Sequence, residues 1–70
     1  MNSKELKAQI VRKGKSIDQL CAAIGISRSA WFRKVSGESE FTQGEICGLR
    51  QELELDDHLT SQIFFAPDVS

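Results

Sequence analysis

Arginine and serine side chains recur within residues 28–36 of this 70-residue chain, RSAWFRKVS. Arg28, Ser29 and Arg33 have helical spacing, so a helix over this stretch would present them along one edge. Arginine donates two hydrogen bonds to guanine, and the short serine side chain can pair with more than one base. The first turn of such a helix also favours a phosphate, because its backbone N–H groups are free and the helix dipole is positive there. The stretch therefore has the chemistry to read base edges in the major groove of DNA.

This assignment predicts two groups of contacts. The side chains expected to approach the bases are Ser27, Arg28, Ser29, Phe32 and Arg33. The side chains expected to contact the phosphate backbone are Lys13, Lys15, Gln19, Lys34, Ser36, Ser39 and Thr42. Phe32 is the discriminating residue, because an exposed phenyl ring can lie against a thymine methyl group or fill a pocket in another protein.

A second predicted helix, over residues 17–24, immediately precedes the arginine-bearing one. Ser16 and Gln19 form a capping-box pattern at its start, and Gly25 supplies the left-handed residue that ends it. Ser27 then caps the following helix. A connection of about three residues that contains glycine is too short for a relaxed antiparallel hairpin and is typical of a helix-turn-helix. The apolar residues expected to share the buried face of this pair are Ile17, Leu20, Cys21, Ile24, Ala30, Trp31 and Val35.

Helical periodicity predicts three further helices. The first covers residues 3–13, with a buried stripe of Leu6, Ile10 and Val11. The next covers residues 43–53 and begins with a capping box formed by Thr42 and Glu45. Its expected core residues are Ile46, Cys47, Leu49 and Leu53, and Leu55 just after it is a further candidate. The last covers residues 57–65, begins at the cap Asp56 and is ended by Pro67.

The predicted fold is all-α, a compact five-helix bundle with a helix-turn-helix at its second and third helices. Seventy residues suffice for one domain at most. We expect that domain to cover residues 1–66 and residues 67–70 to form a frayed C-terminal tail.

Charge is divided sharply between the two halves of the chain. Residues 1–35 carry eight Lys or Arg against two acids, whereas residues 36–70 carry Arg50 against eight acids. The overall charge of −1 hides this polarity. A protein that lays one basic face on a polyanion shows such a division, so the charge pattern favours nucleic acid as the partner.

The helix-turn-helix segment resembles the DNA-binding core of the lambda-repressor-like, Cro-type family. The matching positions are Cys21, Gly25, Ser27, Trp31 and Gly37. A longer similarity, through GISRSAWFRKVSGESEFTQGEI and IFFAP, resembles small phage-type regulators of Gram-positive bacteria. The resemblance implies a small transcriptional regulator, of repressor or Cro type, that binds double-stranded operator DNA.

The cysteines and the histidine give no sign of a metal site or of catalysis. Cys21 and Cys47 lie among apolar helical neighbours and are expected to be buried, reduced thiols. Two cysteines and one histidine without a CxxC motif do not make a zinc site. The sequence has no catalytic triad pattern and no glycine-rich phosphate loop, so we expect no enzyme activity, no cofactor, no metal and no small-molecule substrate.

The expected location is the cytoplasm. No apolar run approaches the roughly 20 residues that span a membrane. Lys4, Glu5 and Lys7 near the start do not fit a secretory signal. We therefore expect no membrane partner.

Two questions about partners stay open at the level of sequence. A single small module buries limited DNA surface, so two copies on a pseudo-palindromic operator are expected. The apolar residues Phe64 and Phe65 exceed what a short helix normally buries and are candidates for a homodimer contact. The alternative function is a helix-turn-helix-shaped protein-binding module, an antirepressor or adaptor, in which Phe32 matters more than the arginines.

Overall fold

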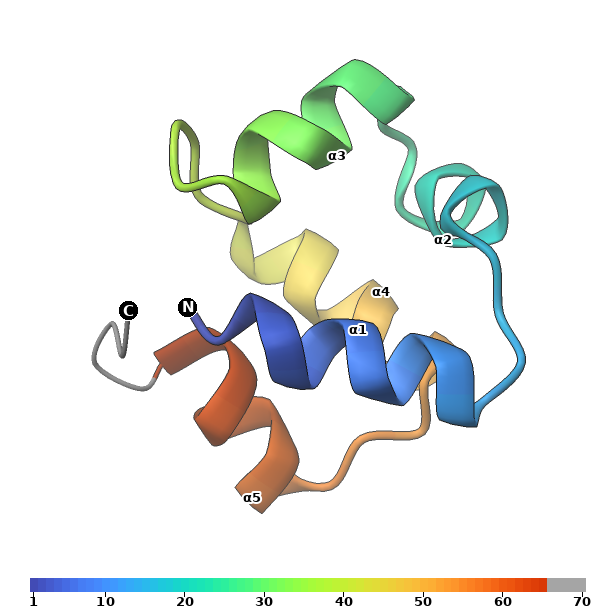
Figure 1. Ribbon diagram of the computed structural model, residues 1–70, viewed down its shortest axis with the longest axis vertical. Helices are drawn as coiled ribbons and strands as arrows, with labels where there is room; N and C mark the ends of the chain where they lie inside the picture. The colour runs from blue at the N-terminus through green and yellow to red at the C-terminus, as the bar shows by residue number, and fades with distance from the viewer. Residues whose placement is uncertain (66–70) are drawn as a thin grey trace.

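Six helical segments follow one another in the computed structural model, which describes residues 1–65 (Figure 1). They are α1 (Ser3–Arg12), α2 (Ile17–Ile24), α3 (Arg28–Val35), α4 (Gln43–Glu52), α5 (Asp57–Thr60) and the π-helical segment η1 (Ser61–Phe65). Every regular element within residues 1–65 is helical, which confirms the all-α prediction. The predicted tail, residues 67–70, and the predicted helix end at Pro67 lie outside the described residues.

The predicted helix starts are confirmed by their caps. Ser16 Oγ accepts from the N–H of Gln19 at 3.1 Å, and the N–H of Ser16 donates to Gln19 Oε1 at 2.8 Å. Thr42 and Glu45 exchange the same two bonds at 3.1 and 2.9 Å. These reciprocal bonds satisfy N–H groups that the first turn of a helix leaves without partners. The caps that begin α3 and α5 are Ser27 and Asp56, as predicted, and that of α1 is Asn2.

Two helix ends show how left-handed residues redirect the chain. Gly25 has φ +72° and follows α2, where the N–H of Ile26 donates to the carbonyl of Cys21 at 3.0 Å. The same arrangement ends α4, where the N–H of Leu55 donates to the carbonyl of Arg50 at 2.9 Å. There the left-handed residue is Glu54, with φ +51°, so a residue with a Cβ occupies a conformation that favours glycine.

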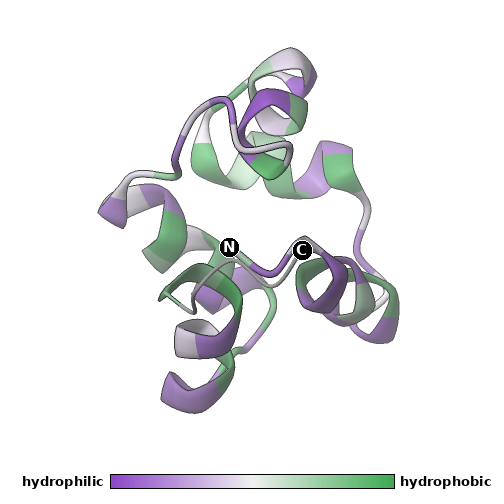
Figure 2. Ribbon diagram, turned by 60° about the vertical axis from the view of Figure 1, so that its left-hand side comes forward, coloured by the Kyte–Doolittle hydropathy of each residue, from purple (hydrophilic) through white to green (hydrophobic). Residues whose placement is uncertain are grey.

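A single apolar core joins the helices. Its buried members are Leu6, Ile10, Leu20, Cys21, Trp31, Leu49, Leu53, Leu55 and Ile63. Hydrophobic and hydrophilic residues alternate along the helices that surround it (Figure 2). The core therefore draws on every helical segment except α5, whose Leu59 packs against it half-buried.

The predicted buried stripe of α1 is wrong at Val11. Its side chain is 80% exposed, whereas Gln9 is buried with 3% exposed. Leu6, Gln9 and Ile10 recur at spacings of three and four and share one face, but Val11 is five residues from Leu6 and points away from that face. Angular position around the helix therefore decides burial here, and residue type does not.

The predicted core face of α4 is wrong at Cys47, whose thiol is exposed. Gly48 instead faces α2, the helix against which α4 packs. A Cβ at Gly48 would lie 2.7 Å from Ile24 Cγ2, so the two helices approach too closely there for any larger residue without movement. Ile46 is half-buried, while Leu49 and Leu53 are buried as predicted.

The last predicted helix, residues 57–65, changes its hydrogen bonding halfway. Only Asp57–Thr60 is α-helical, and Ser61–Phe65 continues as a π-helix. Ile63 is fully buried and Phe64 half-buried, whereas Phe65 is 65% exposed. The N–H of Asn2 donates to the carbonyl of Ile63 at 2.7 Å, which ties the start of the chain to η1.

The helices place α3 and α5 at opposite ends of the molecule, with α1 and α4 between them (Figure 1). α3 is therefore presented at one end of the bundle, with its outer side free of the other helices.

Within residues 1–65, no helix is long and apolar enough to cross a membrane.

Candidate nucleic-acid interface

The turn between α2 and α3 consists of Gly25, Ile26 and Ser27. Figure 1 shows α2 almost along its axis while α3 lies across the view, so the two helices are far from parallel. The Cys21 thiol donates a long hydrogen bond, 3.9 Å, to the carbonyl of Ser27 across this turn. Burial, with the nearby Asp18 charge, raises the pKa of Cys21, so the thiol keeps the proton that it donates.

One aromatic residue fastens α3 to the core. Trp31 is 2% exposed, and its ring and that of Phe41 lie edge to face at a centroid distance of 5.5 Å. Phe41 in turn meets Phe64 at 5.8 Å, again edge to face. Edge-to-face aromatic pairs add about 0.5–1.5 kcal/mol to the area they bury. Trp31 thus fixes which side of α3 faces inward.

The outer side of α3 carries the predicted base-reading residues. The exposed residues along it are Ser27, Arg28, Ser29, Phe32, Arg33 and Ser36. Arg28, Phe32 and Ser36 are four apart, and Ser29 and Arg33 form a neighbouring row, so they make one continuous stripe. Phe32 is 47% exposed, and α3 contains no acidic residue. The stripe therefore offers two guanidinium groups, hydroxyl groups and one phenyl ring to a partner.

Arg28 is held in place by a contact that the sequence did not reveal. Its Nη1 lies 2.7 Å from Asp18 Oδ1, and its guanidinium lies 5.6 Å from the centre of the Phe32 ring. The hydrogen bond and the charge of Asp18 raise the pKa of Arg28 above its ordinary value. Both side chains are largely exposed, so the pair exchanges readily for another anion. Asp18 caps no helix, and only the turn geometry brings it to Arg28.

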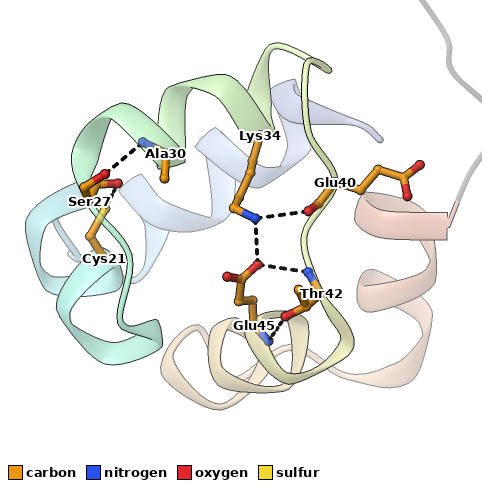
Figure 3. A network of polar contacts seen from close by, with 7 residues as sticks. All are labelled: Cys21, Ser27, Ala30, Lys34, Glu40, Thr42 and Glu45. Atoms are coloured by element: carbon orange, nitrogen blue, oxygen red, sulfur yellow. Dashed lines mark hydrogen bonds and ion pairs between the residues drawn. The ribbon is translucent and has the colours of Figure 1, made fainter.

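Lys34 does not lie on the exposed stripe. Its Nζ lies 3.0 Å from Glu45 Oε1 and donates to the carbonyl of Glu40 at 3.1 Å (Figure 3). The ammonium also lies 5.7 Å from the centre of the Phe41 ring. Its side chain is only 13% exposed. The predicted backbone contact of Lys34 thus involves a group that the fold already uses internally.

The other predicted backbone-contact residues differ in how free their side chains are. Gln19 and Thr42 use their polar atoms in the caps of α2 and α4. Lys15 is paired with Glu52 at 3.6 Å, and Ser36 Oγ donates to the carbonyl of Arg33 at 3.0 Å. Lys13 and Ser39 are exposed. Capping groups at the start of a helix still lie beside free N–H groups that a phosphate can reach.

Two carboxylates flank the far end of the stripe. Glu38 and Glu40 are exposed in the loop between α3 and α4, next to Ser39. Their charge opposes a phosphate near this loop. The N-terminal end of the stripe, at Arg28, is therefore better placed for a polyanion than the last turn, where Arg33 lies near this loop.

A pocket of about 380 Å³ lies between the C-terminal end of α3 and η1. Its lining includes Met1, Lys34, Phe41, Ile46, Phe64 and Phe65. Phe64 and Phe65, the two predicted dimer-contact residues, thus lie on the same side of the molecule as the end of α3.

Comparisons of the chain with protein-family models, with curated proteins and with solved structures each find no match. The functional argument therefore depends on the residues of the α3 stripe and on the geometry that presents them.

Proposed function

We propose that the chain binds double-stranded DNA sequence-specifically, using α2 and α3 as a helix-turn-helix of the lambda-repressor-like type. The observation that carries this proposal is the exposed stripe of α3, which combines Arg28, Ser29 and Arg33 without an acidic residue. Trp31 buries the inner side of the same helix, so the stripe faces outward. In this role the protein is a small transcriptional regulator.

The two arginines have different tasks under this proposal. Arg33 has no ion-pair partner within residues 1–65 and can donate to a guanine without losing a contact. Arg28 exchanges Asp18 for a base or a phosphate when DNA arrives. Its position in the first turn of α3 adds the free N–H groups of that turn to the same anion.

Two copies on a pseudo-palindromic operator extend the proposal. One short recognition helix reads few base pairs, and a second copy doubles the contacts and adds the specificity that a regulator needs. Phe65, 65% exposed beside the half-buried Phe64, supplies apolar surface for a contact between the copies.

The test begins with selection of a preferred duplex from a random-sequence pool by the wild-type protein. Arg33→Ala is then compared with Arg50→Ala, whose arginine belongs to α4 and is paired with Asp57. We expect Arg33→Ala to weaken binding of the selected duplex by roughly ten- to a hundredfold, the effect of one lost arginine–guanine contact. Arg50→Ala should leave binding unchanged. Equal effects of the two variants, or no selection at all, would contradict the proposal.

One observation favours a second candidate, a protein-binding module. Phe32 exposes 47% of its surface at the centre of the stripe, where a partner protein can receive it. Phe32→Ala separates the candidates, because a protein partner loses its main apolar anchor, whereas the salt dependence of DNA binding stays the same.

A further inference from the structure

Lys34 belongs to α3 by sequence but points away from the exposed stripe and towards α4 (Figure 3). Its ammonium has three partners, which are Glu45 Oε1 at 3.0 Å, the carbonyl of Glu40 at 3.1 Å and the ring of Phe41 at 5.7 Å. With the Lys34 side chain 13% exposed and that of Glu45 15% exposed, this is the least exposed ion pair among residues 1–65. Partial exclusion of water strengthens such a pair relative to one at the surface.

Glu45 joins this pair to the start of α4. The same oxygen, Oε1, that meets the ammonium also accepts from the N–H of Thr42 at 2.9 Å, while Thr42 Oγ1 accepts from the N–H of Glu45. The capping box of α4 is therefore continuous with the contact to α3. Lys34 also contacts the loop between α3 and α4, because it donates to the Glu40 carbonyl.

This contact gives α3 a directional attachment in addition to its apolar ones. Trp31 and Val35 fasten the helix through apolar contacts, which restrain rotation of the helix weakly because they are not directional. Lys34 follows Trp31 by three residues, hence on a nearby side of the helix, and its hydrogen bonds have fixed direction. The apolar contacts and this directional contact together define the orientation of the α3 axis.

We propose that the Lys34–Glu45 pair sets the aim of α3, so that both residues are positioning residues for base reading. The effect on base reading rests on the proposed DNA-binding function, but the effect of the pair on the orientation of α3 does not. It assigns Lys34 an internal role in place of a phosphate contact. It also gives a carboxylate near the proposed interface, that of Glu45, a role that supports binding of a polyanion.

Two isosteric variants isolate the pair. Lys34→Met keeps the methylene chain over Phe41 and removes the ammonium. Glu45→Gln keeps an oxygen that can accept from the N–H of Thr42, so the capping box survives while the charge is lost. Gln51→Ala, at an exposed position of α4 that has no predicted role in binding, is the matched control for a change that leaves the pair intact.

The first arm of the test needs no DNA. Residual dipolar couplings of the backbone N–H groups measure the orientation of α3 relative to α4 in each variant. We expect Lys34→Met and the double variant to change the α3 couplings in the same way, because both lose the ammonium. Glu45→Gln should change them in the same direction but less, because its amide oxygen can still accept from the Lys34 ammonium. Unchanged α3 couplings in both single variants would show that the Lys34–Glu45 pair does not set the orientation of α3.

The second arm measures affinity for the duplex selected by the wild-type protein and for a random-sequence duplex. We expect each variant to lower the ratio of the two affinities about tenfold, the size of one impaired base contact, without changing the salt slope. A contribution to stability alone would lower the melting temperature and leave this ratio unchanged, which would overturn the positioning role.

If Lys34 instead contacts a phosphate, the two variants should give different results. Lys34→Met would then reduce the salt slope by about 0.9, and Glu45→Gln would tighten binding because it releases the ammonium and removes a negative charge. Failure of the wild-type protein to select any duplex would refute the DNA-binding function. The dipolar couplings would still decide whether the Lys34–Glu45 pair sets the orientation of α3.

Discussion

Gly48→Ala tests the closest approach between two helices in the fold. A Cβ at Gly48 would meet Ile24 Cγ2 at 2.7 Å, about 0.7 Å short of ordinary contact at 3.4 Å. Cγ2 cannot swing aside, because it is bonded directly to Cβ and a β-branched side chain in a helix has one strongly preferred rotamer. The helices must therefore separate or the side chain must leave its rotamer.

The magnitude follows from two opposing terms. Overpacking of this kind costs about 1–3 kcal/mol, whereas replacing a helical glycine with alanine gains about 1 kcal/mol. We expect Gly48→Ala to lower the free energy of unfolding by up to about 2 kcal/mol. Gly44→Ala in the same helix is the matched control. A Cβ there would meet only Thr42 Oγ1, at 4.0 Å, so the variant should gain up to about 1 kcal/mol.

The assay is urea unfolding, monitored both by Trp31 fluorescence and by far-ultraviolet circular dichroism. Ile24→Leu removes Cγ2 while it conserves volume, so Gly48→Ala should cost much less in that background than in the wild type. Coincident midpoints by the two probes establish that the transition is two-state. The reasoning fails if Gly48→Ala is as stable as Gly44→Ala, or if Ile24→Leu gives no relief.

Three further predictions concern a helix end, an ion pair and a titration. Glu54→Gly should raise the free energy of unfolding, measured by thermal melts, by about 1 kcal/mol. The left-handed conformation at φ +51° costs about 1–2 kcal/mol for a residue with a Cβ, and glycine avoids this cost. A loss of stability would contradict this prediction. Asp18→Asn should tighten binding of random-sequence DNA and steepen its salt dependence, because Arg28 is freed for a phosphate; weaker binding at low salt would contradict this. Burial of Glu45 raises its pKa, but the N–H of Thr42 and the charge of Lys34 outweigh burial, so the pKa lies below the ordinary 4.5. Its stabilising contribution is therefore complete above pH 4.5 and is lost as pH falls through the lowered pKa, a loss that melting temperatures should show in wild-type protein but not in Glu45→Gln.

The starts and ends of the helices could be predicted because short-range contacts determine them. A cap such as Ser16 needs only a partner three residues away, and Gly25 needs only a left-handed residue after the last turn. The end of the helix over residues 43–53 was predicted, but the left-handed conformation of Glu54 after it was not, because a glutamate gives no sign of it. The π-helical turn after Thr60 also has no local signal in the sequence.

Burial was harder to predict, because it depends on which side of a helix meets a neighbour. Val11 and Cys47 are apolar by type and exposed in the structure, whereas Gln9 is polar and buried. Gly48 is informative only once Ile24 is known to lie opposite it.

The same division applies to the candidate interface. The exposure of Arg28, Phe32 and Arg33 follows from helical spacing once Trp31 is assigned to the core. The internal role of Lys34 could not be predicted, since its partner Glu45 is eleven residues away on another helix. Asp18 is likewise brought to Arg28 only by the turn between α2 and α3.

The most direct test of the proposed DNA binding is an NMR titration of ¹⁵N-labelled protein with random-sequence duplex DNA, first at low and then at moderate salt. We expect salt-sensitive amide shifts at residues 27–36, with α5, at the opposite end of the molecule, unaffected. The absence of shifts at low salt would contradict DNA binding by this chain. Shifts confined to the lysines of α1 would contradict the assignment of α3 as the recognition helix.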